Sequence, residues 1–181
     1  MGWEFEVLRW FADIRNDVLT KIMEFFTTIG DLGIFWIALC AVFLIIPKTR
    51  RIGVFMAVSL VVEVALGEGL LKHLIQRERP FIQDPTITTL IPAPLGKYSF
   101  PSGHTTASAA AVAAIFLQNK KLSVPFFFAA AMIIVSRLYF CVHFPTDILG
   151  GIVLGIAVAV AVYYVLTYIE KKRAEKLKAD D

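Results

Sequence analysis

The chain has 181 residues, of which 57% are hydrophobic and only 18% are charged. An average soluble domain is about 45–50% apolar and about 25% charged. This apolar excess excludes a soluble globule and a disordered chain, and it predicts membrane spans, which need about 20 mostly apolar residues each. The net charge of +3 is small, so no nucleic-acid partner is indicated. The length is that of a single domain, residues 1–181.

The N-terminal segment, residues 1–30, has apolar residues every three or four positions from Trp3 to Ile29. This spacing is typical of an amphipathic helix. The segment has no excess of basic residues, so we interpret it as one or two helices on the outer membrane interface, broken near Asn16. The alternative interpretation is a sixth, tilted span. Residues 1–6 do not resemble a cleavable signal peptide, because they lack a basic region.

Five apolar stretches follow this segment, and each is predicted to form a membrane helix. They are residues 32–46, 52–71, 105–117, 122–142 and 148–169. Basic clusters come after the first, third and fifth stretches and hold ten of the 18 lysines and arginines. The positive-inside rule places that side in the cytoplasm, including a basic tail at residues 170–181. The predicted fold class is an all-α polytopic membrane bundle of about six core helices.

The cysteines and tryptophans are predicted to be structural. Cys40 and Cys141 are too few for a disulfide framework or a metal cluster, and their predicted depths differ, so we expect them to be unpaired. We interpret Trp3, Trp10 and Trp36 as aromatic residues of the membrane interface.

Four ionisable residues lie in or beside the predicted spans, where a charge costs roughly 2.5–3.5 kcal/mol on insertion scales. Glu68 and Lys72 are four residues apart and are expected to pair. For Glu63 and Glu68, a structural and a functional role remain equal alternatives. Lys72 and Arg137 lie near the outer ends of their stretches, beside other polar residues.

Three helix ends bring these polar residues to one face of the membrane. Lys72 precedes Arg79, Ser102 and Gly103 open the third stretch, and Arg137 lies near the end of the fourth. Cations combined with a helix N-terminus favour a polyanionic ligand. Ser102 is a plausible N-cap, and Gly103 allows an anion to approach the backbone.

Two of the three histidines belong to the same predicted cluster and indicate chemistry as well as binding. His143 is followed four residues later by Asp147. A histidine can attack phosphorus through one ring nitrogen while a carboxylate holds the other. His104 is then a candidate general acid for the departing oxygen. Nearby cations would stabilise the charge that develops on the transferred phosphoryl group.

These residues form three motifs that resemble the signature of the type 2 phosphatidic acid phosphatase (PAP2) family. The motifs are Lys72, six residues, Arg79-Pro80; Pro101-Ser102-Gly103-His104; and Ser136-Arg137, five residues, His143, three residues, Asp147. All three are complete and in order. The resemblance implies a membrane-bound, metal-independent phosphatase without a cofactor, working through a phosphohistidine intermediate.

The same resemblance implies roles for individual residues. His143 would be the nucleophile, Asp147 the residue that orients it, and His104 the general acid. The phosphate would be bound by Lys72, Arg79, Ser102, Gly103 and Arg137. Among compact bacterial members the sequence resembles enzymes acting on undecaprenyl diphosphate, phosphatidylglycerophosphate or phosphatidate, and we favour undecaprenyl diphosphate.

Several alternatives stay open from the sequence. A lipid phosphotransferase would use the same residues, and a transporter would also carry charges in its spans. Arg77 and Lys97 are expected to steer or anchor anionic headgroups. The expected location is the plasma membrane, with several spans and the active site on the extracytoplasmic side. The substrate and the bilayer are the expected partners, and no oligomeric state is predicted.

Overall fold

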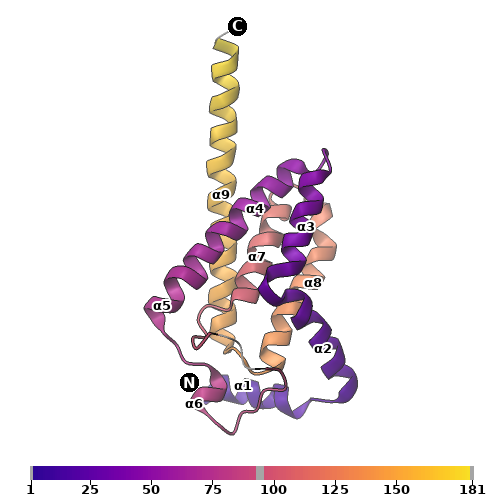
Figure 1. Ribbon diagram of the computed structural model, residues 1–181, viewed down its shortest axis with the longest axis vertical. Helices are drawn as coiled ribbons and strands as arrows, with labels where there is room; N and C mark the ends of the chain where they lie inside the picture. Colours follow the sequence, from indigo (N-terminus) through magenta and orange to yellow (C-terminus); the bar gives the residue numbers. More distant parts are fainter. Residues whose placement is uncertain (1, 93–95, 180–181) are drawn as a thin grey trace.

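The computed structural model describes residues 2–92 and 96–179, and Figure 1 shows a bundle of helices. Within these ranges there is no strand, only an isolated bridge between Glu78 and Tyr98. The helices are α1 (Gly2–Asp13), α2 (Asp17–Gly30), α3 (Ile34–Ile45), α4 (Arg50–Val64), α5 (Lys72–Ile75), α6 (Pro80–Gln83), α7 (Gly103–Phe116), α8 (Lys120–Tyr139) and α9 (Pro145–Ala179). The predicted all-α membrane bundle is confirmed.

The N-terminal segment breaks at Asn16, whose side chain accepts a hydrogen bond from the backbone N–H of Leu19 at 3.0 Å and so caps α2. α2 then bends into α3 through a 3₁₀ turn at Asp31–Gly33, where Leu32 and Gly33 have positive φ. Together α2 and α3, Asp17–Ile45, are long and apolar enough to cross a membrane. The structure therefore differs from the expectation of an interfacial segment over residues 1–30, because only α1 stands apart from the spans.

Among the described residues, four helical units are long and apolar enough to span a membrane: Asp17–Ile45, Arg50–Ile75, Lys120–Tyr139 and Pro145–Ala179. The predicted third span corresponds to α7, which has only 14 residues. At about 1.5 Å per residue it covers roughly 21 Å, less than the hydrocarbon core of about 30 Å. α7 packs against α4, α8 and α9 and lies inside the bundle, although Phe116 at its C-terminal end is exposed.

The second span is not a uniform α-helix. Between α4 and α5 the chain forms a π-helical segment at Ala65–Leu71, which includes Glu68. A π-helical segment changes the direction in which the following side chains point around the helix axis, and such segments are frequent at functional sites.

The three basic clusters lie at one end of the bundle. Arg51 at the start of α4 pairs with Glu170 of α9 at 2.9 Å and donates to Gln118, which follows α7, at 3.2 Å. Figure 1 shows the C-terminal turns of α9 projecting at this end, with α1 and α6 at the opposite end. The grouping of the clusters agrees with the prediction, although the last residues of the predicted tail, 180–181, lie outside the described residues.

The core is built from small residues in α7 and large ones around it. A Cβ at Gly155 of α9 would lie 2.5 Å from the carbonyl oxygen of Thr106, so only glycine permits this close packing of α9 on α7. Trp36 is 1% exposed and its indole N–H donates to Ser108 Oγ at 3.0 Å. The expectation of an interfacial Trp36 is therefore wrong, whereas Trp3 and Trp10 are exposed. Both cysteines are buried and free, as predicted.

Candidate active site

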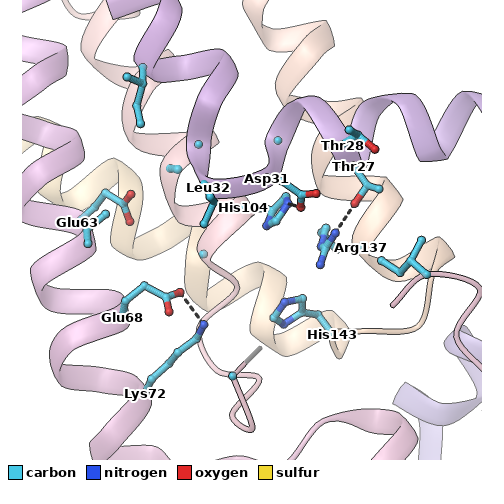
Figure 2. A pocket seen from close by; sticks show the side chains of 18 of the residues that line it. Thr27, Thr28, Asp31, Leu32, Glu63, Glu68, Lys72, His104, Arg137 and His143 are labelled. Atoms are coloured by element: carbon cyan, nitrogen blue, oxygen red, sulfur yellow. Dashed lines mark hydrogen bonds and ion pairs between the residues drawn. The ribbon is translucent and has the colours of Figure 1, made fainter. Parts of the chain in front are cut away.

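A cavity of about 830 Å³ opens where α2 bends into α3, opposite the π-helical segment of the second span. Figure 2 shows His104, Arg137 and His143 at one side of it, with Glu63, Glu68 and Lys72 on the facing helix. Six of the predicted site residues line this cavity: Lys72, Arg79, Gly103, His104, Arg137 and His143. Residues separated by up to 71 positions in the sequence are thus brought to one site.

His143 follows α8 in a tight connection to α9, and it is 2% exposed. Its Nε2 lies 3.3 Å from a guanidinium nitrogen of Arg79, and its Nδ1 lies 3.5 Å from Oδ2 of Asp147. Because a guanidinium group can only donate, Nε2 must be the accepting nitrogen. We therefore assign the ring proton to Nδ1, on the side of the carboxylate, which leaves a lone pair on Nε2.

The surroundings of His143 keep this ring neutral. The pKa of His143 is lowered to about 3, chiefly by burial and in part by the charges of Arg79 and Arg137, while Asp147 opposes this shift. The ring therefore stays uncharged at neutral pH. A neutral imidazole is the form that can act as a nucleophile.

Asp147 lies in the first turn of α9 and is fully buried. Its Oδ2 accepts from the backbone N–H of Phe144 at 2.8 Å, and its Oδ1 accepts from Arg77 at 2.7 Å. Arg77 also pairs with Glu4 of α1 at 2.7 Å, and its side chain is 14% exposed. The expectation that Arg77 steers headgroups is therefore not met, because both of its terminal nitrogens are engaged inside the protein.

His104 is in the first turn of α7 and its side chain is 16% exposed. Its Nε2 lies 3.0 Å from Oδ1 of Asp31, in the bend between α2 and α3. The bend also approaches the ring closely, since a Cβ at Gly30 would lie 2.8 Å from Cδ2 of His104. Residues at the bend of the first span thus contact His104 and fix its position.

The cations of the site are each held by a polar neighbour. Lys72 forms the expected pair with Glu68, at 2.5 Å. Arg79 donates to the carbonyl oxygens of Gly96 and Val142 at 2.8 and 2.9 Å. Arg137 donates to Thr27 Oγ1 through Nη1, while its Nε is buried and has no hydrogen-bond partner among the described residues. These cations surround the histidines and suit an anion.

Of the two predicted phosphate-binding residues at the start of α7, Gly103 lines the cavity and Ser102 is not among the described residues that line it. Ser102 occupies the N-cap position of α7, but its hydroxyl accepts from Thr105 at 3.0 Å instead of capping the helix, and the residue is fully buried. Gly103 lines the cavity, where an added Cβ would lie 2.5 Å from Oε1 of Glu68. A residue larger than glycine at this position would therefore require the Glu68 carboxylate to move.

Several polar residues in or beside the cavity were not identified from the sequence, among them Glu4, Thr27 and Asp31. Glu4 had a detectable signal, because it lies four residues before the buried Leu8 and so shares the apolar face of α1. The contact between Asp31 and His104 depends on the bend at Leu32, whose left-handed backbone has no signature in the sequence.

The described residues contain no group of three or more histidine, cysteine, aspartate or glutamate side chains suited to a metal ion. Lys72, Arg79 and Arg137 line the cavity and suit an anionic ligand. Together with a neutral histidine and a buried carboxylate, they form a set of groups that can support attack on a phosphoryl group.

Comparison with known proteins identifies the family of this chain. Two curated relatives are an undecaprenyl-diphosphatase of Sulfolobus acidocaldarius, 32% identical over 86% of this chain and 74% of the relative, and undecaprenyl-diphosphatase BcrC of Bacillus subtilis, 30% identical over 80% and 73%. A crystal structure of a transmembrane PAP2 type phosphatidylglycerolphosphate phosphatase from Bacillus subtilis matches with a TM-score of 0.75, covering 93% of this chain and 86% of that one at 24% identity. The PAP2 superfamily model matches residues 48–171, and the chain therefore belongs to the PAP2 superfamily of phosphatases.

Proposed function

We propose that this protein removes the terminal phosphate from undecaprenyl diphosphate through a covalent phosphohistidine at His143. The observation that carries the proposal is the assignment of the two nitrogens of that ring. His143 lines the cavity, its Nε2 carries a lone pair that accepts from Arg79, and its Nδ1 faces the buried Asp147. This is the arrangement that a histidine nucleophile requires.

In the first step, the lone pair of Nε2 attacks the terminal phosphorus while the bond from phosphorus to the bridging oxygen breaks. His104 delivers a proton to the departing oxygen, and it therefore enters the second step deprotonated. Arg79, Arg137 and Lys72 stabilise the charge on the non-bridging oxygens. The phosphorylated ring carries a positive charge, which Asp147 offsets from the Nδ1 side.

In the second step, water attacks the phosphorus of the phosphohistidine. His104 now accepts a proton from that water, the bond between phosphorus and Nε2 breaks, and inorganic phosphate leaves. The lone pair returns to Nε2, and Nδ1 keeps its proton throughout. The balance is one water consumed and one phosphate released, with no oxidant or reductant.

The choice of a polyprenyl diphosphate is supported by the relatives and by the lining of the cavity. Two relatives at 30% identity or above bear the name undecaprenyl-diphosphatase. The cavity is lined by apolar as well as charged side chains, including Leu32, Ile37, Leu60 and Val64. An amphiphile with a charged head and a hydrocarbon chain matches this mixture of surfaces.

A phosphate-release assay on the purified protein in detergent tests this proposal. The panel compares undecaprenyl diphosphate, phosphatidylglycerophosphate and phosphatidate, each with and without EDTA. We expect the highest kcat/KM with undecaprenyl diphosphate, and no loss with EDTA. A preference for a diacyl lipid would contradict the proposed substrate, transfer of phosphate to another lipid without release would indicate a phosphotransferase, and rescue by magnesium after EDTA would contradict the mechanism.

We also propose that the protein lies in the plasma membrane with the cavity on the extracytoplasmic side, because the basic clusters at the other end favour the cytoplasm. Cysteines introduced singly at Leu90 and Lys176, both exposed, test this orientation in a variant without Cys40 and Cys141. A membrane-impermeant maleimide should label position 90 in intact cells and position 176 only after permeabilisation. The reverse pattern would contradict the orientation.

A further inference from the structure

The amphipathic helix α1 contains a carboxylate that is unexpectedly buried. Glu4 is 4% exposed, whereas Glu6 of the same helix is exposed. Removing a carboxylate from water is costly unless it is paired and hydrogen-bonded. The burial of Glu4 therefore points to a specific set of partners.

Those partners come from two segments that flank the site. Glu4 Oε2 pairs with Arg77 at 2.7 Å, in the connection between α5 and α6. Glu4 Oε1 accepts from the hydroxyl of Thr146 at 2.6 Å and from its backbone N–H at 3.3 Å, in the first turn of α9. One carboxylate thus joins the chain that follows the second span to the start of the last span.

Arg77 continues this network to Asp147. One terminal nitrogen contacts Glu4, while the other donates to Asp147 Oδ1 at 2.7 Å and to the hydroxyl of Thr146 at 2.5 Å. The guanidinium carbon lies 4.0 Å above the ring of Phe144. The planar, fork-like guanidinium is therefore held between two carboxylates and an aromatic face.

These contacts determine which way Asp147 faces. Oδ1 is held by Arg77 and Oδ2 by the backbone N–H of Phe144, so the carboxylate cannot rotate without breaking both bonds. In this orientation Oδ2 faces Nδ1 of His143 at 3.5 Å. Neither Glu4 nor Arg77 is among the described residues that line the cavity, so neither is placed to contact the substrate.

We propose that Glu4 and Arg77 are positioning residues that hold Asp147, and through it His143, in the geometry of attack. The proposal rests on the proposed function, in which His143 is the nucleophile. It means that α1, which lies outside the three signature motifs, contributes to the geometry of the site. Loss of either residue should slow formation of the phosphoenzyme and leave substrate binding unchanged.

The experiment compares Arg77→Gln, Arg77→Lys and Glu4→Gln with wild type, using Glu6→Gln as the matched control on the exposed face of α1. Steady-state kcat and KM are measured with undecaprenyl diphosphate in detergent, and the rate of phosphoenzyme formation by rapid quench. Misplacement of a reacting group by about 1 Å costs on the order of 100-fold. We expect kcat to fall about 10- to 100-fold in Arg77→Gln, less in Arg77→Lys and Glu4→Gln, with KM within about twofold.

A double variant separates positioning from a general effect on the fold. If Arg77 acts through Asp147, then adding Arg77→Gln to Asp147→Asn should cause little further loss. Multiplicative losses in the double variant, or a raised KM with unchanged kcat in Arg77→Gln, would overturn the inference. If Arg77→Gln does not fold, the milder Arg77→Lys and Glu4→Gln carry the same comparison with Asp147→Asn.

The outcome also separates this inference from the proposed function. Normal kcat in the Glu4 and Arg77 variants, together with loss of the phosphoenzyme in His143→Ala, would refute only the positioning role. A phosphoenzyme that persists in His143→Ala would refute the proposed function itself.

Discussion

The two histidines of the cavity are held in different ways. His143 has a side chain 3% exposed, and its partner Asp147 is fully buried and bonded to a further charged residue. His104 has a side chain 16% exposed, and its partner Asp31 is 56% exposed in the bend of the first span. One histidine is held by a buried network, and the other pairs with a carboxylate that is itself exposed.

This difference suits two chemical roles. A nucleophile must meet phosphorus along a defined line, so a rigid and neutral ring is favoured. A group that protonates the leaving group and then takes a proton from the attacking water must be reachable by water, so partial exposure is useful. The predictions that follow are ordered from the largest expected effect to the smallest.

Replacing the buried histidine should have the largest effect. His143→Ala removes the atom that bonds to phosphorus, so turnover of undecaprenyl diphosphate should fall by more than about 10⁵-fold, as when a protease nucleophile is deleted. His73→Ala is the matched control, because His73 is exposed and lies outside the cavity. Residual turnover within tenfold of wild type would contradict the assignment.

Asp147→Asn should cause the second-largest loss of turnover. An amide in place of the carboxylate cannot offset the charge of the phosphorylated ring and can favour the wrong tautomer, a change that costs on the order of 10⁴-fold in a serine protease. Phosphate release measures the loss, with Asp13→Asn on the exposed surface as control. A loss of turnover in Asp147→Asn smaller than that in His104→Ala would contradict the claim that the buried Asp147 supports the nucleophile.

His104→Ala should depend on the leaving group. General acid catalysis contributes about 10²–10⁴-fold, and a leaving group that needs no proton escapes much of that loss. We expect a large loss with an alkyl phosphate and a smaller loss with an activated aryl phosphate that enters the site. Equal losses with both substrates would argue that His104 binds the phosphate and does not donate a proton.

Asp31→Asn should have the smallest effect of the four. Asp31 orients His104 through one partly exposed contact, so we expect a loss of about tenfold, which corresponds to about 1.4 kcal/mol in the barrier. The loss should disappear when the same change is made in His104→Ala. Asp17→Asn serves as the control. A loss in Asp31→Asn as large as that in Asp147→Asn would contradict the difference between the Asp31–His104 pair and the Asp147–His143 pair.

The fold and the centre of the site were largely predictable from the sequence because each rests on a strong local signal. Apolar stretches and basic clusters predicted the helices and their grouping at one end. Three motifs with fixed spacing identified Lys72, Arg79, His104, Arg137 and His143, which do converge on the cavity. A motif constrains residues that meet one ligand, so its members share a site even when the chain between them is long.

The surrounding contacts were not predictable, because they depend on how helices meet. Asp31 contacts His104 from the bend at Leu32, and Glu68 approaches Gly103 from the π-helical segment. Arg77 and Glu4 are 73 residues apart, and nothing in their local sequence links them. Trp36 was misjudged for a similar reason, since its partner Ser108 lies on another helix.

The central claim is that phosphorus bonds to His143, and rapid-quench labelling tests it most directly. Wild-type protein and the His143→Ala and His104→Ala variants would be mixed with undecaprenyl diphosphate carrying ³²P in the terminal phosphate, quenched in alkali, digested and mapped. The account predicts acid-labile phosphate on the peptide containing His143 in the wild type, reduced but present in His104→Ala and absent in His143→Ala. Label on His104, or label retained in His143→Ala, would contradict it.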